Sequence, residues 1–220
     1  MPAGTQPVTF PAARGGPRLA GVLHLPGSPG PHPAALVCHP HPLMGGTMES
    51  AVVVALCHAL AARGWAGLRF DFRGAGRSAG SFDEGRGEMD DVAGAFDLLC
   101  TRPEVDRRRL AVVGYSFGAG VGLHQAATDG RPRWMVGIAL VQDQYADPFL
   151  DADPRPKLLI GGAHDPWAPP DPLRAYSARL HPPATLRVIQ GADHFFAGHE
   201  SELAQIVVNW LRDQDKPQQT

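Results

Sequence analysis

The stretch GYSFGAG at residues 114–120 places one serine, Ser116, between two glycines, directly after the apolar run LAVV at residues 110–113. In a sharp turn from a strand into a helix, side chains two positions on either side of the apex would collide, and glycine removes them. Gly114 and Gly118 stand at those two positions. The pattern therefore predicts a buried strand, a tight turn that exposes the serine hydroxyl above a sheet, and a helix.

A glycine-rich turn between a strand and a helix also occurs where proteins bind the phosphates of a dinucleotide. Here Gly118, Gly120 and Gly122 give the spacing GxGxG instead of GxGxxG, and the chain contains no GK[ST] phosphate loop. This spacing favours a nucleophilic role for Ser116. Because the free N–H groups at a helix start favour negative charge, the backbone amide of Phe117 is a candidate donor to an oxyanion.

The whole chain has the size and composition of one α/β domain, with 220 residues of which 44% are hydrophobic. We expect a single domain over residues 1–220, with its core at about residues 6–212 and a polar C-terminal tail. The net charge is −2 and no run of Lys or Arg is present, so we expect no nucleic-acid partner and no membrane partner.

The N-terminus lacks a basic start followed by a long apolar run, and no apolar stretch approaches the roughly 20 residues that cross a bilayer. The three cysteines, Cys38, Cys57 and Cys100, show no CxxC spacing for a metal or redox pair. We therefore expect reduced core thiols and a cytoplasmic location.

Strand and helix patterns alternate through most of the chain. Two short segments at residues 7–12 and 18–26 predict an antiparallel pair. Further strands are expected at 34–40, 66–74, 108–114, 135–141, 157–162 and 184–191, and helices at 49–63, 89–99, 117–127, 171–180 and 201–213. This order predicts a mostly parallel central sheet that begins with an antiparallel N-terminal edge pair and carries helices on both faces.

A serine hydroxyl is a weak nucleophile at neutral pH, so it needs a base to accept its proton and an acid to orient that base. Asp165 follows the apolar strand KLLI, and His194 follows the next strand, TLRVIQ. The carboxyl ends of parallel strands lie at one edge of a sheet. We therefore expect Ser116, Asp165 and His194 to converge there, with His194 as the base and Asp165 as the acid.

The other histidines fit different roles better. His164 is expected only to flank the loop of the acid, and Asp193 to bond local backbone in a turn, because adjacent loop residues rarely point at each other. Six more histidines lie within predicted helices, in early edge segments or at polar ends, with no strand-end acid to orient them, and most of the histidines are expected to be surface or capping groups. The six are His24, His32, His58, His124, His181 and His199.

The loop CHPHPLMGGTM at residues 38–48 contains an HxH pair, His39 and His41, which raises the alternative of a zinc or iron site. The remaining ligands would have to come from residues 164–165 and 193–194. No HExxH helix is present, and prolines alternate with the two histidines, so we expect neither a metal nor another cofactor.

The same loop leaves the sheet at the predicted site and is expected to provide the second oxyanion donor. Pro40 and Pro42 have no N–H, so the candidates are the backbone amides of His41, which we favour, and Leu43. At the end of another strand, FDFRGAGRSAG contains Asp71 and Arg73. These two could touch substrate, but we expect them to form an ion pair that braces loops.

Four motifs occur in the order CHPHPLMGGTM, FDFRGAGRSAG, GYSFGAG and GADHFF. Together they resemble the small bacterial branch of the α/β-hydrolase superfamily, near the dienelactone-hydrolase-like proteins, and the resemblance covers residues 6–212. It implies a serine hydrolase with Ser116, Asp165 and His194 as a catalytic triad, and the Phe117 and loop amides as an oxyanion hole. Dienelactone hydrolases use a cysteine nucleophile, so Ser116 favours an ordinary ester or thioester as the small-molecule substrate.

Many relatives insert a helical cap after the strand that corresponds to residues 135–141. Here only residues 142–156 precede the next strand, which is barely enough for one crossover, so we expect an open cleft without a lid domain. Its lining is expected to be apolar. The candidates, which could instead be ordinary residues that anchor loops, are Leu43, Met44, Tyr115, Tyr145, Phe149, Trp167 and Phe195.

The sequence thus supports three hypotheses of different kinds. The first is a hydrolase of small carboxylic esters or thioesters that acts through an acyl-serine intermediate. The second is a binding module that keeps the fold without turnover, and the third is a metal-dependent hydrolase that uses the HxH loop. The presence of a nucleophile, a base and an acid favours the first.

Overall fold

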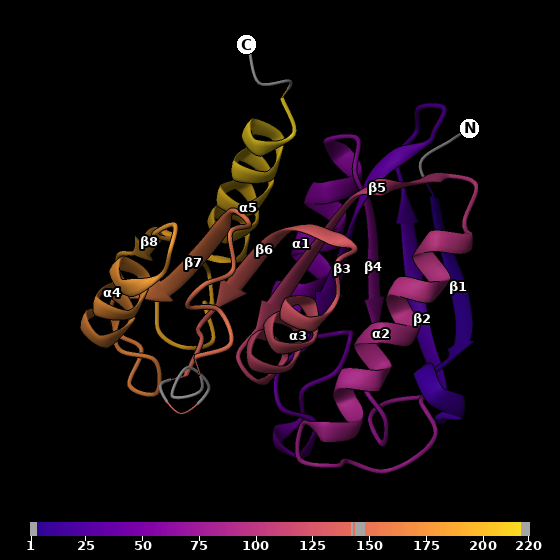
Figure 1. Cartoon of the computed structure of the whole chain (residues 1–220), viewed down its shortest axis with the longest axis horizontal. Helices are drawn as coiled ribbons and strands as arrows, with labels where there is room; N and C mark the ends of the chain where they lie inside the picture. Colours follow the sequence, from indigo (N-terminus) through magenta and orange to yellow (C-terminus); the bar gives the residue numbers. More distant parts are fainter. Residues whose placement is uncertain (1–3, 142, 144–147, 217–220) are drawn as a thin grey trace.

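The computed structural model describes residues 4–141, 143 and 148–216. Within these ranges one eight-stranded sheet has the order β1-β2-β4-β3-β5-β6-β7-β8 (Figure 1). The strands are β1 Gly4–Pro11, β2 Arg18–Leu25, β3 His32–Cys38, β4 Ala66–Phe70, β5 Val105–Tyr115, β6 Pro132–Ile138, β7 Lys157–Gly162 and β8 Thr185–Ile189. β2 pairs antiparallel with both β1 and β4, and the other pairs are parallel. The predicted antiparallel edge is confirmed.

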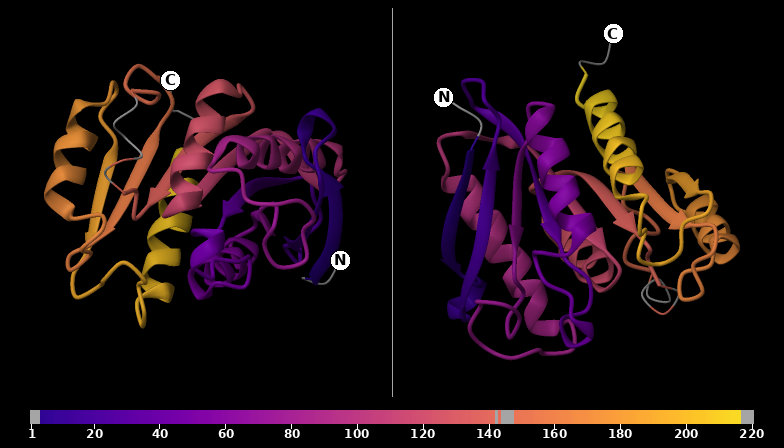
Figure 2. Two further views of the ribbon diagram at one scale, coloured as in Figure 1. Left: turned by 90° about the horizontal axis from the view of Figure 1, so that it is seen from below. Right: turned by 180° about the vertical axis from the view of Figure 1, so that it is seen from behind.

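Helices cover both faces of the sheet, as predicted (Figures 1 and 2). One face carries α2 Arg86–Thr101, α3 Phe117–Thr128 and α4 Pro170–Arg179, and the other carries α1 Ala51–Ala62 and α5 Glu200–Gln214. The view from behind in Figure 2 shows α1 and α5 together in front of the sheet. The result is three layers, with an apolar core on each side of the strands.

The central strands contribute to both cores, which explains their continuous apolar sequences. In β3, Ala34, Leu36 and Cys38 pack under α2 and α3, whereas Ala35 and Val37 pack under α1. Side chains in a strand alternate between the two faces, so a strand that is covered on both faces needs apolar residues at every position.

The cysteines lie within this packing and form no disulfide. Cys38 and Cys57 are buried, Cys100 is half-buried, and all three are free. Burial raises the pKa of the Cys57 thiol to about 12 and that of Cys38 still further. Both thiols are therefore protonated and unreactive at neutral pH.

The parallel strands β3, β5, β6, β7 and β8 all end at the same edge of the sheet (Figure 1). The loops that follow them build the site described below. The loop after β3 contains a short 3-10 helix, η2 Pro42–Met44. In the described parts of residues 139–156, between β6 and β7, there is no cap domain over this edge. No helix within the described ranges is long and apolar enough to cross a membrane.

Candidate active site

Ser116 sits at a strained turn between β5 and α3. Its φ of 54° and ψ of −119° lie outside the regions that L-residues favour. A Cβ on Gly114 would lie 2.3 Å from the carbonyl oxygen of Gly118. A Cβ on Gly118 would lie 2.5 Å from the carbonyl oxygens of Cys38 and His39. The two glycines are thus required by close backbone contact, within the turn at Gly114 and against the end of β3 at Gly118.

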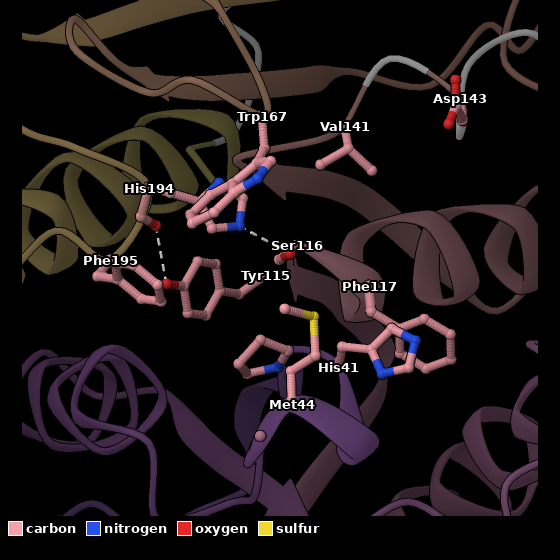
Figure 3. A pocket seen from close by; sticks show the side chains of 12 residues that line it. His41, Met44, Tyr115, Ser116, Phe117, Val141, Asp143, Trp167, His194 and Phe195 are labelled. Atoms are coloured by element: carbon pink, nitrogen blue, oxygen red, sulfur yellow. Dashed lines mark hydrogen bonds between the residues drawn. The ribbon is translucent and has the colours of Figure 1, made fainter.

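The structure brings Ser116, His194 and Asp165 together in one chain of polar contacts, although they come from loops after three different strands. Ser116 Oγ lies 3.0 Å from His194 Nε2, and His194 Nδ1 lies 2.7 Å from Asp165 Oδ2 (Figure 3 shows the first contact). All three residues are buried, with His194 at 7% exposure. Because a carboxylate only accepts hydrogen bonds, Nδ1 carries the proton and Nε2 is left to accept one from the serine.

Asp165 is held as a carboxylate by its surroundings. Its Oδ1 accepts hydrogen bonds from the backbone amides of Trp167, at 2.9 Å, and Ala168, at 2.8 Å. Burial raises the pKa of this carboxyl, but the hydrogen bonds from His194 and from the two amides outweigh burial and hold the pKa below its ordinary value. The group is therefore ionised and fixed in place at neutral pH.

The loop that carries His194 is anchored by its neighbours. The Tyr115 hydroxyl donates a 2.8 Å hydrogen bond to the backbone carbonyl of His194. Asp193 accepts a 2.9 Å bond from the amide of Phe195, which is the local turn role expected for it. The carbonyls of residues 192 and 193 pack closely against Gly162, at the end of β7. A Cβ added to Gly162 would lie only 2.6 Å from both carbonyl oxygens, so this position has no room for a side chain. The exposed His164 takes no part in the contact chain.

A model of the family described as serine aminopeptidase, S33, matches residues 31–147, which is more than half of the chain. The chain belongs to this family within the α/β-hydrolase superfamily. An uncharacterized protein from Rickettsia prowazekii is 32% identical to it over 187 residues, covering 81% of this chain and 78% of that protein.

Two solved structures extend this likeness over almost the whole molecule. A protein of unknown function from Agrobacterium tumefaciens has a TM-score of 0.84 and 34% identity, covering 95% of this chain and 96% of that one. An α/β serine hydrolase without a lid from Xanthomonas campestris has a TM-score of 0.85 and 30% identity, covering 99% of both chains. The lidless α/β-hydrolase fold expected from the short β6–β7 connection is confirmed.

In this α/β hydrolase, Ser116 opens into a cleft of about 470 Å³. Four of the side chains expected to line a cleft do so: Met44, Tyr115, Trp167 and Phe195 (Figure 3). His41 and Phe117, expected as oxyanion donors, also line it, as do Pro40 and Gly46 of the same loop as His41. Sequence reasoning missed Val141 and Asp143, because only the folded arrangement brings them to the cleft. Within the described ranges, the large hydrophobic side chains most exposed to solvent, Leu43, Met44, Trp167 and Phe195, all belong to loops around this cleft.

Three of the expected lining residues have other positions. Phe149 lines a neighbouring pocket, where its ring stacks on that of His124 at 4.7 Å. Leu43 points into solvent, with 71% of its surface exposed, and is absent from the cleft wall. Tyr145 lies outside the described residues.

The two oxyanion-loop candidates differ in what their amides contact. The Leu43 amide donates to Nδ1 of the His41 side chain at 3.2 Å, which caps the start of η2. The loop is fixed further along, where the Met48 amide donates to Asp71 and the Met48 carbonyl accepts from Arg69, both at 2.9 Å. The loop is therefore anchored beside Ser116, and the Leu43 amide is already occupied by the His41 side chain.

His39 is committed to the protein through both of its ring nitrogens. Nε2 accepts a 3.0 Å hydrogen bond from the Phe72 amide, and Nδ1 donates at 2.6 Å to the Pro40 carbonyl. Burial lowers the pKa of His39 to about 4, although its bond to the Pro40 carbonyl and the nearby Asp71 carboxylate both oppose this. No group of three metal-binding side chains is found among the residues that the structure describes.

The prediction that Asp71 and Arg73 form an ion pair with each other is wrong. Arg73 binds the buried Asp91 of α2 instead, with 3.0 and 2.7 Å contacts to its Oδ1. Asp71 accepts from the backbone amides of Met48 and Arg77. The two carboxylate oxygens of Asp71 are occupied by these amides and the guanidinium of Arg73 by Asp91, so the expected pair does not form. Both residues nevertheless brace loops, as expected.

His24 lies in the early edge strand β2, as expected, and His32 begins β3, but neither is a surface or capping group. Both are buried, with exposures of 2% and 6%. His24 Nε2 accepts a 3.0 Å hydrogen bond from Nε of Arg69, and His32 Nε2 contacts the Ser28 carbonyl. In strands, burial depends on which neighbours cover each face, and a short sequence pattern does not reveal that.

Proposed function

We propose that this protein hydrolyses small carboxylic esters or thioesters through an acyl-Ser116 intermediate. The observation that carries the proposal is the continuous contact chain from Ser116 Oγ through His194 to Asp165, placed at the wall of an open cleft. Each group has the neighbour that its role requires: the hydroxyl has a base, and the base has an oriented carboxylate.

In the first half of the reaction, His194 Nε2 takes the proton of Ser116 while Oγ attacks the carbonyl carbon of the substrate. Asp165 stabilises the imidazolium that forms. The carbonyl oxygen becomes an oxyanion in the tetrahedral intermediate. When the intermediate collapses, the bond from carbon to the alcohol oxygen or thiol sulfur breaks. His194 then gives its proton to that leaving group, and the acyl group remains on Ser116.

The second half repeats these steps with water. His194 takes a proton from a water molecule whose oxygen attacks the acyl carbon, and a second oxyanion forms. Collapse of this intermediate breaks the bond to Ser116 Oγ. His194 returns its proton to Oγ, and the carboxylic acid leaves the cleft. The site is then restored with no net change in the protein.

The oxyanion would be stabilised by two backbone amides. Phe117 is the first residue of α3, so its N–H has no acceptor within the helix and lies at the positive end of the helix dipole. For the second donor, the contact of the Leu43 amide with the His41 side chain favours the His41 amide, which lines the cleft with Ser116. Donors fixed before reaction act without reorganisation, which is the main source of such stabilisation.

Labelling with a fluorophosphonate, together with a panel of short-chain aryl esters, tests this proposal. The wild type is expected to be labelled and to hydrolyse the esters. Ser116→Ala is expected to lose labelling and to lower kcat/KM by roughly 10⁴-fold or more. Labelling that survives in Ser116→Ala would exclude Ser116 as the nucleophile. Normal folding without turnover of any ester would favour the binding module, and loss of activity on chelation would favour a metal-dependent hydrolase.

A further inference from the structure

A second pocket of about 410 Å³ adjoins the Ser116 cleft. The two pockets share Phe117 and Asp143 in their walls, so they are neighbours, and the second pocket extends along α3 past Val121 and His124. The Phe117 ring is held in place by the rings of His41 and Phe82, at 4.9 and 5.6 Å. A ligand group that extends past Phe117 and Asp143 therefore meets the second pocket next.

The triad geometry decides which end of an ester would lie where. The tetrahedral carbon has four substituents: Ser116 Oγ, the oxyanion, the leaving oxygen and the acyl carbon. The leaving oxygen must lie beside His194 Nε2, because that atom delivers its proton. Three rings lie near the His194 ring: those of Trp167, at 5.0 Å, Phe195, at 5.9 Å, and the buried Tyr115, at 6.1 Å. The alcohol portion thus lies against the two exposed rings, those of Trp167 and Phe195.

The acyl portion must then extend from the tetrahedral carbon on the side of Ser116 opposite His194. Figure 3 places His194, Trp167 and Phe195 on one side of Ser116, and Val141, Asp143 and Phe117 on the other. Beyond Phe117 lies the second pocket. We propose that the second pocket binds the acyl group of the substrate, while the alcohol group lies against the contacting rings of Trp167 and Phe195, whose centroids are 5.5 Å apart. This inference rests on the proposed ester hydrolysis and assigns each part of the substrate to its own pocket.

The chemistry of the second pocket indicates an apolar acyl group longer than acetyl. Its inner wall consists of Met89, Val121 and the Phe149 ring, which stacks on His124 with 14° between the ring planes. The charged members of its wall are exposed: Glu84 and Arg86 pair with each other at 3.4 Å, and Asp143 stands where the pocket adjoins the Ser116 cleft. An apolar chain or ring of the acyl group gains burial here and displaces no inner charge.

Filling the second pocket tests the acyl assignment. His124 is half-buried on α3 and lines the pocket, and the neighbouring Gln125 is half-buried without lining it. We expect His124→Trp to lower the ratio of kcat/KM for p-nitrophenyl octanoate to that for p-nitrophenyl acetate by at least about tenfold. Gln125→Trp is the matched control and should leave this ratio within about twofold.

The reciprocal variant tests the alcohol assignment. Trp167→Ala is expected to lower kcat/KM for phenyl acetate relative to methyl acetate by about fivefold or more, and to leave the octanoate-to-acetate ratio nearly constant. The opposite pattern, in which Trp167→Ala changes acyl preference and His124→Trp changes alcohol preference, would overturn the inference. So would an unchanged acyl ratio in His124→Trp. Failure of the proposed function is distinct, because acetate esters would then not be hydrolysed by the wild type in a manner that depends on Ser116.

Discussion

At the residue level, two acidic side chains lie near His194, and their contacts separate their roles. Asp165 uses one carboxylate oxygen for the imidazole and the other for two backbone amides, so its position is fixed on both sides. Asp193 precedes His194 in sequence, yet its carboxylate accepts from the Phe195 amide and is exposed to solvent. Closeness in sequence here does not place the carboxylate at the imidazole.

Replacing each acid by its amide compares the two directly. Asp165→Asn keeps the shape but removes the charge that selects the His194 tautomer, so we expect kcat for a short aryl ester to fall by roughly 10³- to 10⁴-fold. Asp193→Asn keeps an acceptor for the Phe195 amide and should change kcat by less than about threefold. Steady-state kinetics at neutral pH on both variants measures this. Equal losses in the two variants would mean that the acid is wrongly assigned.

At the level of elements, the site depends on how closely α3 approaches β3. The N-terminal turn of α3 rests on the carbonyls of Cys38 and His39, at the start of the loop that we propose to supply an oxyanion donor. Gly118 is the residue in contact, and it has no room for a side chain. The distance between Ser116 and the loop after β3 is thus set by one backbone contact.

Gly118→Ala should therefore impair stability and activity together. The added Cβ would lie 2.5 Å from two backbone carbonyl oxygens, which forces the helix away from the strand. We expect a loss of about 1–3 kcal/mol in the free energy of unfolding and a fall in kcat. Gly130→Ala is the control, since a Cβ there has nothing within 4 Å and its φ is not positive. Urea unfolding and ester hydrolysis measure the two effects, and wild-type values for Gly118→Ala would contradict this account.

The same elements show what sequence alone could predict. Ser116, Asp165 and His194 follow apolar strands, and the ends of parallel strands share an edge, so their convergence could be inferred without coordinates. The ion-pair partner of Arg73 could not be inferred from the sequence, because Asp91 lies in a helix that packs beside the loop of Arg73. The place of Phe149 depends likewise on where its ring meets His124 across two elements. Strand order predicts where loops gather, whereas side-chain direction across packed elements sets the walls of the cleft.

At the level of the whole molecule, two buried histidines couple folding to pH. His24 contacts Arg69 and His58 and has Glu49 nearby, whereas His39 has Asp71 nearby. Burial lowers the pKa of each imidazole to about 4, with Arg69 and then His58 adding to the effect at His24. An unfolded histidine titrates near 6.5. Between these values the unfolded chain binds more protons than the folded protein, so stability rises with pH.

The molecule should therefore lose stability as pH falls from about 6.5 to about 4, with up to about 1–3 kcal/mol from each of the two imidazoles. Glutamine in His24→Gln keeps an acceptor for Arg69 but does not titrate. The fall in the free energy of unfolding between the two pH values should therefore be smaller in this variant by the contribution of one histidine. His181→Gln, at an exposed position, should leave the loss as in the wild type. Urea unfolding at pH 7 and pH 4.5 gives the difference for each protein. If the free energy of unfolding changes between pH 7 and pH 4.5 by the same amount in His24→Gln as in the wild type, then His24 takes up its proton equally in the folded and unfolded states.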